Sequence, residues 1–491
     1  MTLSDKNLTL LTDLYQLTMA QGYWANDKLD EQAVFHAFFR SNPFGGGYAV
    51  ACGTNQLEDL IRNFHYSDSD MEYLSSLRNA DGSAMFDLDF LLWLSKLELS
   101  VDIDAVKDGT IVFAHEPLVR VSGPLVQCQL LETALLNGIN FQTLIATKAS
   151  RVVRAASGKP VSEFGLRRAQ GPDGGLSASR AAFIGGVSSV ANVLAGKQYG
   201  IPVNGTHAHS WVMAFESEQD SFRAYAQSNP NNCSLLVDTY NVISGIEAAI
   251  DVGVEMKRQG KRLMAVRIDS GDLAWLSKKA RIMLDDAGLR NVKIVASNDL
   301  DEYTIHALNA QGACIDSYGV GTRLVTAYDQ SALGGVYKLA AIRKNIKEPW
   351  IPCLKISEEA SKITIPGILD VCRFVNDDGK FAGDCIYDVQ RKLDKITVAV
   401  DPIDNTRRKQ YSLDMQHEKL LKPFARGGKI CSDIDTDVNT CRRHFEEQYA
   451  MLDDSIKRFK NPHRYPAGIE RMLFNERTRM VLHLRGLDSL Y

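Results

Sequence analysis

Between about residues 150 and 340, short runs of apolar and β-branched residues alternate with longer amphipathic stretches. The amphipathic stretches predict helices at Ser177–Gln198, Val242–Gln259, Leu273–Ala287 and Leu300–Gln311. The apolar runs predict strands at Val161–Phe164, Ile201–Thr206, Ser234–Thr239, Leu263–Asp269, Val292–Ser297 and Ile315–Val320. Each repeat spans about 30 residues, the length of a strand plus a crossover helix. This succession predicts an α/β fold with a parallel sheet, and the number of repeats favours an irregular parallel α/β barrel over residues 151–340.

The flanking segments follow other patterns. Residues 1–150 mix helical and strand patterns around the turn Gly45–Gly47. Beyond residue 340, Lys355–Ser357 and Lys362–Gly367 alternate like strands, and a charged helix is expected from Asp437 to Phe459. We therefore expect residues 1–150 to form an N-terminal α+β domain. Residues 341–491 either return to it, giving a discontinuous domain, or form a C-terminal extension.

Composition narrows the class of protein. The 491 residues suffice for two or three domains, and a net charge of -4 gives no reason to expect nucleic acid or an anionic membrane as a partner. Met1–Tyr15 lacks the basic and apolar regions of a signal peptide, and no uncharged apolar run is long enough to span a bilayer. The nine cysteines contain no Cys-x-x-Cys pair, which is typical of reduced thiols in a cytoplasmic protein.

Residues able to bind ligands follow every predicted strand. Because parallel strands end on one side of a sheet, these residues should gather on one rim, where α/β proteins bind their ligands. They comprise Arg167 and Arg168, Thr206 to His209, Asp238 and Thr239, Asp269 to Asp272, Ser297 to Asp299, and Gly319 to Thr322. One polar strand end would mean little, but six together predict a functional rim.

Arg267 precedes Asp269 by two residues, so both side chains should point to the same face of the strand. An Arg inside a barrel is costly unless an anion pairs with it, and that anion is either a ligand or a neighbouring Asp. Asp269 suits ribose hydroxyls, whereas Asp272 is expected to cap the following helix. The loop Gly319–Thr322 offers backbone N–H groups suited to phosphate.

His207 and His209 form a His-x-His pattern that binds metal in many hydrolases. That interpretation needs further ligands. The other His between residues 150 and 340 is His306, which falls within a predicted helix, so a metal-dependent hydrolase is disfavoured.

Several segments together resemble the nicotinate phosphoribosyltransferase family, which belongs to the type II phosphoribosyltransferases. The similarity spans nearly the whole chain in the expected order. It lies in Leu11–Met19, Phe39–Arg40, Gly45–Tyr48, Glu163–Gly174, Gly205–Ser210, Val266–Asp272, Gly319–Thr322, Gly334–Leu339 and Asn461–Pro466.

The resemblance implies an irregular α/β barrel with a discontinuous domain, working as a homodimer whose subunits share active sites. It implies transfer of 5-phosphoribosyl from 5-phosphoribosyl 1-pyrophosphate to nicotinate, which salvages nicotinate for NAD synthesis. The reaction would use Mg²⁺ and would be coupled to ATP hydrolysis through phosphorylation of His209. His207, whose equivalent is usually apolar in the family, is expected to be a bystander.

The resemblance also assigns binding residues. Nicotinate would lie between Tyr15 of the partner subunit and Phe164, with Thr206 nearby and Arg267 on its carboxylate. The donor would be held by Arg167, Asp269, Ser297, Asn298, Gly321 and Thr322. Asp269 would also act in catalysis, because positive charge develops on the ribose as its C1–O bond breaks.

One position departs from the family. Ala191-Asn192 stands where the family commonly has Ser-Asn, and the Asp of its nicotinamide-using relatives is missing from this neighbourhood. Because a carboxylate would repel nicotinate, its absence favours the acid over the amide. Two alternatives remain: a nicotinamide phosphoribosyltransferase, and a non-catalytic mononucleotide-binding protein on the same scaffold.

Overall fold

A computed structural model describes residues 7–431 and 435–487. The chain divides into two compact units, the first made of residues up to 144 and from 332 onward, the second of residues 145–331. The sequence patterns placed these boundaries near 150 and 340.

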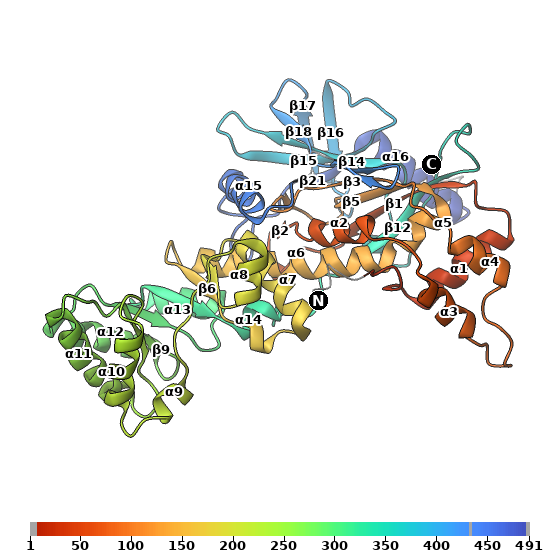
Figure 1. Ribbon diagram of the computed structural model, residues 1–491. Coiled ribbons are helices and arrows are strands. Elements are labelled where there is room, and N and C mark those ends of the chain that lie inside the picture. The colour runs from red at the N-terminus through yellow and green to blue at the C-terminus, as the bar shows by residue number, and fades with distance from the viewer. Residues whose placement is uncertain (1–6, 432–434, 488–491) are drawn as a thin grey trace. The chain divides into compact units, whose positions relative to one another are not determined.

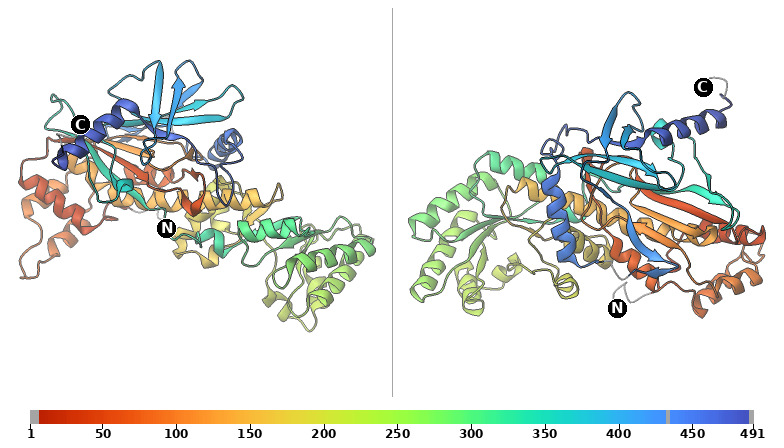
Figure 2. Two further views of the ribbon diagram at one scale, coloured as in Figure 1. Left: turned by 180° about the vertical axis from the view of Figure 1, so that it is seen from behind. Right: turned by 90° about the horizontal axis from the view of Figure 1, so that it is seen from above.

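The second unit is built on a six-stranded parallel sheet, with strand order β7-β6-β11-β10-β9-β8. The strands are β6 Val161–Glu163, β7 Ser189–Val190, β8 Ser234–Leu236, β9 Ala265–Ile268, β10 Lys293–Ala296 and β11 Ser317–Val320. The helices are α7 Gly171–Ile184, α8 Val193–Tyr199, α9 His209–Met213, α10 Glu218–Ser228, α11 Val242–Arg258, α12 Leu273–Asp286, α13 Glu302–Ala310 and α14 Thr322–Val325. Both α11 and α12 pack against β9 (Figures 1 and 2). The predicted α/β class and parallel sheet are confirmed.

The sheet has two edges, β7 and β8, that no strand pairing between described residues joins. The predicted strand Ile201–Thr206 is wrong, because this segment forms only an isolated bridge between Val203 and Val190 of β7. The predicted helix Ser177–Gln198 is also wrong. It is split into α7 and α8 by Gly186, whose φ of 108° ends the helix, and by β7, which pairs with β6.

The first unit contains two larger sheets. In the first, the order is β13-β12-β1-β5-β3-β19-β20, and its adjacent strands pair antiparallel. The second has the order β17-β16-β21-β15-β14-β18 and is antiparallel except where β21 pairs with β15. Together with the pair β2 and β4, these strands are β1 Gln32–Phe39, β2 Ala49–Val50, β3 Asp102–Ala105, β4 Ile111–Val112, β5 Val119–Pro124, β12 Gly335–Arg343, β13 Ile351–Pro352, β14 Leu369–Val375, β15 Phe381–Asp388, β16 Ile396–Val400, β17 Arg408–Ser412, β18 His417–Lys419, β19 Lys422–Arg426, β20 Lys429–Ile430 and β21 Ala467–Glu470.

Helices complete the first unit: α1 Leu14–Ala25, α2 Thr54–Arg62, α3 Asp68–Ser76, α4 Leu88–Leu94, α5 Leu125–Leu130, α15 Val438–Met451 and α16 Arg471–Leu484. The helix α6, Glu132–Ala155, belongs to both units. Buried side chains of α1, α3, α4 and α5 form one apolar cluster.

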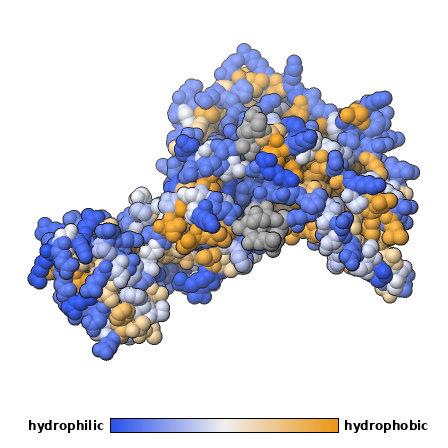
Figure 3. Space-filling view, viewed as in Figure 1, coloured by the Kyte–Doolittle hydropathy of each residue, from blue (hydrophilic) through white to orange (hydrophobic). Residues whose placement is uncertain are grey.

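In the second unit, the exposed face around α10, α11 and α12 is largely hydrophilic (Figure 3).

Two expectations for the C-terminal part are wrong. Lys355–Ser357 and Lys362–Gly367 form no strand; the second segment follows a short 3-10 helix, Ala360–Lys362. The charged helix stops at Met451 rather than Phe459, because Leu452 is extended and Asp453 turns its carboxylate to the N–H of Ser455.

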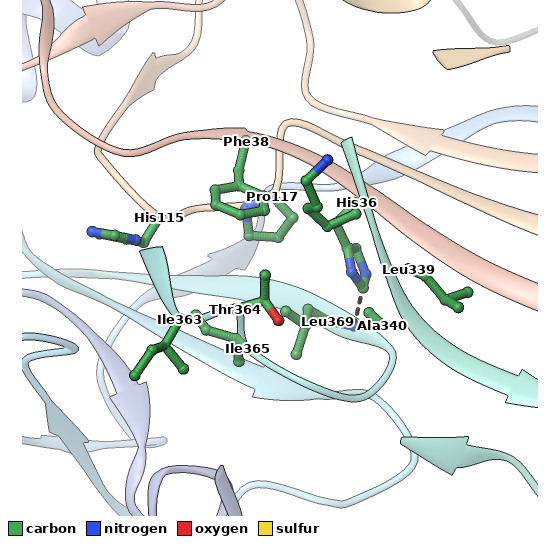
Figure 4. A pocket seen from close by; sticks show the side chains of 11 residues that line it. His36, Phe38, His115, Pro117, Leu339, Ala340, Ile363, Thr364, Ile365 and Leu369 are labelled. Atoms are coloured by element: carbon green, nitrogen blue, oxygen red, sulfur yellow. Dashed lines mark hydrogen bonds between the residues drawn. The ribbon is translucent and has the colours of Figure 1, made fainter. Parts of the chain in front are cut away.

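The two sheets of the first unit meet at His36 of β1, whose Nε2 accepts a hydrogen bond from the N–H of Leu369 at 3.1 Å (Figure 4). Burial lowers the pKa of His36 to about 3, so this ring is neutral. His115 lines the same small pocket, and burial lowers its pKa to about 4. Among the described residues, no helix has the length and apolar character needed to cross a bilayer.

Candidate functional site

Arg267 lies at the centre of a polar cluster at the carboxyl ends of the parallel strands. Its Nη2 donates to Asp269 Oδ1 at 3.1 Å, its Nη1 to Thr206 Oγ1 at 3.0 Å, and its Nε to Ser297 Oγ at 2.7 Å. Ser297 Oγ donates in turn to Asp269 Oδ1. Four of the predicted residues are therefore in direct contact. A guanidinium has five N–H donors, so two remain for a ligand.

The sequence left open whether a ligand or a neighbouring Asp pairs with Arg267. Asp269 does form this ion pair. The pair is only partly buried, with side-chain exposures of 13% for Arg267 and 26% for Asp269. It therefore remains accessible to a bound anion. The expectation that both side chains share a face of β9 is confirmed.

Phe164 covers this cluster. The Arg267 guanidinium carbon lies 5.4 Å from the centre of the Phe164 ring. The ring also lies close to Gly319, where an added Cβ would come within 2.6 Å of it. Just before Phe164, the buried carboxylate of Glu163 accepts from the N–H of Gly165 and from Ser179 Oγ, which fixes the turn that presents the ring.

His209 lies at the start of α9, beside the end of β8. Its Nδ1 is 3.2 Å from Thr239 Oγ1, and its Nε2 is 3.9 Å from Asp238 Oδ1. Asp238 Oδ2 accepts from the N–H of Asp269 at 3.1 Å and from Ser270 Oγ at 2.6 Å. Asp238 thereby connects the imidazole to the Arg267 cluster. With 42% of its side chain exposed, His209 is accessible to a second reactant.

His207 does something different from His209. Its Nε2 accepts from the N–H of Leu236 in β8 at 3.1 Å, and its Nδ1 lies 3.3 Å from the Ala208 carbonyl. Burial lowers its pKa, which favours the neutral ring these contacts require. Both ring nitrogens are therefore engaged with backbone, so His207 has a structural role and His-x-His does not act here as a pair of metal ligands.

The remaining predicted residues of the second unit are at strand ends but outside the Arg267 cluster. Asn298 follows β10 with a φ of 115°, a strained conformation for a non-glycine residue. Gly321 and Thr322 begin the short helix α14 after β11. Arg167 is exposed and forms no hydrogen bond or ion pair with another described residue. Asp272 caps α12 by accepting from the N–H of Trp275 at 3.0 Å, as expected.

Tyr15 belongs to the first unit. It lies in α1 with 47% of its surface exposed. Partial burial and the nearby carboxylates of Glu132 and Asp13 raise the pKa of its hydroxyl. An exposed aromatic ring of this kind is available to a ligand or a partner surface.

The sequence predicted no individual role for two acidic residues at this site, Asp238 and Glu218. Asp238 Oδ1 and Glu218 Oε1 are buried atoms that accept no hydrogen bond from another described residue. Burial, and next the Asp238 carboxylate, raise the pKa of Glu218. Asp238 could have been found from its position directly after a strand, like Asp269. Glu218 carries no such signal, because it reads as an ordinary first-turn helix residue.

The fold and this cluster define an α/β enzyme whose site lies at the carboxyl ends of parallel strands. Comparison with family models is consistent along the chain. Residues 10–140 match the nicotinate phosphoribosyltransferase (NAPRTase) N-terminal domain, residues 154–364 the NAPRTase family, and residues 370–477 the C-terminal domain.

Individual proteins agree with the family models. A nicotinate phosphoribosyltransferase of Bacillus subtilis (strain 168) is 40% identical over 488 residues, covering 98% of this chain and 97% of the relative. One from Mus musculus is 32% identical, covering 94% and 95%. The crystal structure of human nicotinic acid phosphoribosyltransferase superimposes with a TM-score of 0.83 at 30% identity, covering 96% and 99%. The chain belongs to the nicotinate phosphoribosyltransferase family of enzymes.

Proposed function

We propose that this enzyme transfers 5-phosphoribosyl from 5-phosphoribosyl 1-pyrophosphate to the ring nitrogen of nicotinate, forming nicotinate mononucleotide and pyrophosphate for NAD synthesis. The observation that carries the proposal is the Arg267 cluster, a partly exposed cation with spare donors beside an aromatic ring. A planar aromatic acid needs those two features. The names of the relatives support the same substrate.

Nicotinate would place its carboxylate on the two unused donors of Arg267 and its ring against Phe164. A charge-assisted contact contributes about 1.5–3 kcal/mol, and ring stacking about 0.5–1.5 kcal/mol more. Thr206 Oγ1 and Ser297 Oγ fix the guanidinium orientation. We propose that Tyr15 of the partner subunit covers the opposite face of the ring in a homodimer with shared sites. Its exposure on α1 supports that role.

The donor would lie across the neighbouring strand ends. Asp269 is placed to face the ribose, where positive charge develops as the C1–O bond breaks. The backbone at Gly321 and Thr322, the side chain of Asn298 and the exposed Arg167 would bind its phosphates. The strained φ of Asn298 supports a binding role, because such conformations cluster at ligand sites.

Carboxylate oxygens suit Mg²⁺, and Asp238 fits that ion: its Oδ1 is buried and accepts no hydrogen bond from a described residue, while its Oδ2 accepts from the N–H of Asp269. We propose that Asp238 and Asp269 would hold it. When bound there, Mg²⁺ supplies positive charge that offsets the charge of the pyrophosphate.

We propose that ATP phosphorylates His209. Its exposure would admit the γ-phosphate, and Thr239 at Nδ1 leaves Nε2 as the reactive nitrogen. A phosphohistidine would add about two negative charges beside the donor site, which couples ATP hydrolysis to donor binding.

We also propose that the parallel sheet functions as an irregular barrel. Two contacts support this proposal: Val203 forms a bridge with Val190 of the edge strand β7, and His207, four residues later, accepts from the N–H of Leu236 in the other edge strand, β8. The cysteine pattern supports a cytoplasmic location.

The test is product formation from nicotinate or nicotinamide, each with 5-phosphoribosyl 1-pyrophosphate and Mg²⁺, with and without ATP. We expect mononucleotide from nicotinate, accelerated by ATP. Preference for nicotinamide would assign the amide-specific activity instead, and no product from either would contradict catalysis.

A further inference from the structure

A large cavity is lined by residues of the first unit, whereas the residues of the Arg267 cluster belong to the second. Its volume is about 590 Å³, within the roughly 300–1,000 Å³ typical of small-molecule sites. It is lined by the start of α2, the end of β3 and the turn after it, strand β19, the first turns of α15, and the residues Cys431 and Asp435.

Part of the cavity lining is apolar. Val106 and Phe424 are nearly buried, with 5% and 2% of their surfaces exposed, yet both line it. Pro423 continues the same wall. A flat hydrocarbon or aromatic body would lose its contact with water here, which is the main source of affinity in sites of this size.

The lining also includes three cations: Lys107, Lys422 and Arg443. Neither lysine forms an ion pair or side-chain hydrogen bond with another described residue. Among the described residues, Arg443 donates only to the neutral hydroxyl of Thr440, at 3.2 Å. All three cations therefore retain donors for an anionic group.

The lining also contains three carboxylates, Asp108, Asp435 and Glu447, and none of them pairs with these cations. Asp108 is buried and accepts from the N–H of Thr54 at 3.1 Å, so it serves the start of α2. Asp435 accepts from the N–H of Asp437 at 2.9 Å, and Glu447 is exposed. None of the three forms an ion pair with the three cations.

An imidazole also lines the cavity. His444 is 3.0 Å from Thr110 Oγ1 through Nε2, and burial lowers its pKa. A neutral imidazole can donate or accept through its other nitrogen, so it can bind a polar substituent of a ligand.

We propose that this cavity binds a small amphipathic anion, an aromatic or aliphatic body carrying a phosphate, sulfonate or carboxylate group, at a second site separate from the reaction. The apolar body lies against Val106 and Phe424. The anionic group binds Lys107, Lys422 and Arg443.

The test uses three naphthalene probes that share one apolar body: 1-naphthyl phosphate, neutral 1-naphthol and cationic 1-naphthylmethylammonium. Binding is measured by calorimetry on the full chain with the reaction site saturated by nicotinate and pyrophosphate. We expect 1-naphthyl phosphate to bind at least about tenfold more tightly than 1-naphthol, and the cation to bind most weakly. Equal affinity for the cation would overturn the proposal.

The double variant Lys107→Glu/Lys422→Glu should weaken 1-naphthyl phosphate binding by about tenfold or more. The matched control, Lys344→Glu/Lys392→Glu, changes the same charge at exposed lysines outside the cavity and should change it less than about twofold. Thr440→Trp, which fills the cavity without changing charge, should also abolish binding. Unchanged binding in Thr440→Trp, or equal effects of the two charge variants, would show that the anion binds elsewhere.

Discussion

Each unit of this enzyme contains an Arg–Asp pair, and the two pairs have opposite surroundings. In the first unit, Arg373 of β14 and Asp384 of β15 are fully buried, with contacts as short as 2.6 Å. Tyr465 donates to the same carboxylate at 2.8 Å, and Arg373 donates to Gln448 at 2.9 Å. In the second unit, Arg267 and Asp269 are joined by one contact at 3.1 Å and are partly exposed.

The difference separates a structural pair from a binding pair. Burial removes both Arg373 and Asp384 from water, so every remaining donor and acceptor must be satisfied within the protein. The neighbouring Glu116 shows the effect of this environment on a carboxyl group. Burial, and next the negative charge of Asp384, raise the pKa of Glu116 well above the usual range. Arg267 instead keeps two donors and an open side. Exposure and spare hydrogen-bonding capacity therefore identify a site better than residue type does.

The largest effect should come from breaking the buried pair. Arg373→Met leaves Asp384 buried without its cation, which should lower the free energy of unfolding by about 3–5 kcal/mol. The matched variant Arg267→Met should lower it by only about 1 kcal/mol, because water still reaches that pair. Urea unfolding followed by circular dichroism compares the two. Equal losses would contradict the distinction between the pairs.

Removing the exposed imidazole should alter chemistry rather than folding. His209→Ala should lose the stimulation of mononucleotide formation by ATP and weaken donor binding, since the phosphohistidine cannot form. Its unfolding should match that of the wild type, as should the activity of the control His463→Ala at another exposed His. ATP stimulation that persists in His209→Ala would exclude phosphorylation at this residue.

Acid should destabilise the first unit through its buried histidines. The pKa of His36 is about 3 in the folded chain, against about 6.5 unfolded. Below pH 6.5 the His36 ring is therefore protonated in the unfolded chain but stays neutral in the folded chain. The free energy of unfolding falls by about 1.4 kcal/mol per pH unit until the pH reaches the folded pKa. Unfolding between pH 7.5 and 5 should show a shallower slope for His36→Gln, whose amide oxygen can still accept from Leu369. An identical slope would mean that His36 does not resist protonation.

The smallest effect tests the ring above Arg267. In Gly319→Ala the new Cβ would come within 2.6 Å of Phe164, so the ring must shift. We expect a several-fold higher KM for nicotinate, consistent with losing about 0.5–1.5 kcal/mol of stacking, and little change for the donor. Gly22→Ala, at a helical position without a left-handed φ and with no neighbour within 4 Å, is the control for introducing alanine. A KM change confined to the donor would place nicotinate elsewhere.

Local patterns predicted the features that depend on local geometry. Alternation along β9 put Arg267 and Asp269 on one face, and the cap at Asp272 followed from residue type. The shared rim of a parallel sheet predicted that Thr206 and Ser297 lie on the same side as Arg267, but not their hydrogen bonds with it. Fold class followed from the repeat length.

Features that depend on distant partners were missed. Ser189–Val190 is too short to read as a strand and is one only because β6 lies beside it. The apolar run Ile201–Thr206 looks like a strand but lacks a partner beyond Val190. The roles of His207 and Asp238 depend on Leu236 and Asp269, which lie about 30 residues further along the chain. The spacing of apolar and polar residues does not predict contacts between side chains that are this far apart in the chain.

The most direct test of the central claim is the ratio of kcat/KM for nicotinate to that for nicotinamide, measured in the wild type and in Arg267→Gln. If Arg267 binds the carboxylate, the wild type should strongly favour the acid. The variant should lower the ratio by about 10- to 150-fold, the equivalent of about 1.5–3 kcal/mol for a charge-assisted contact. A ratio unchanged by the substitution would contradict the assignment of this cluster as the nicotinate site.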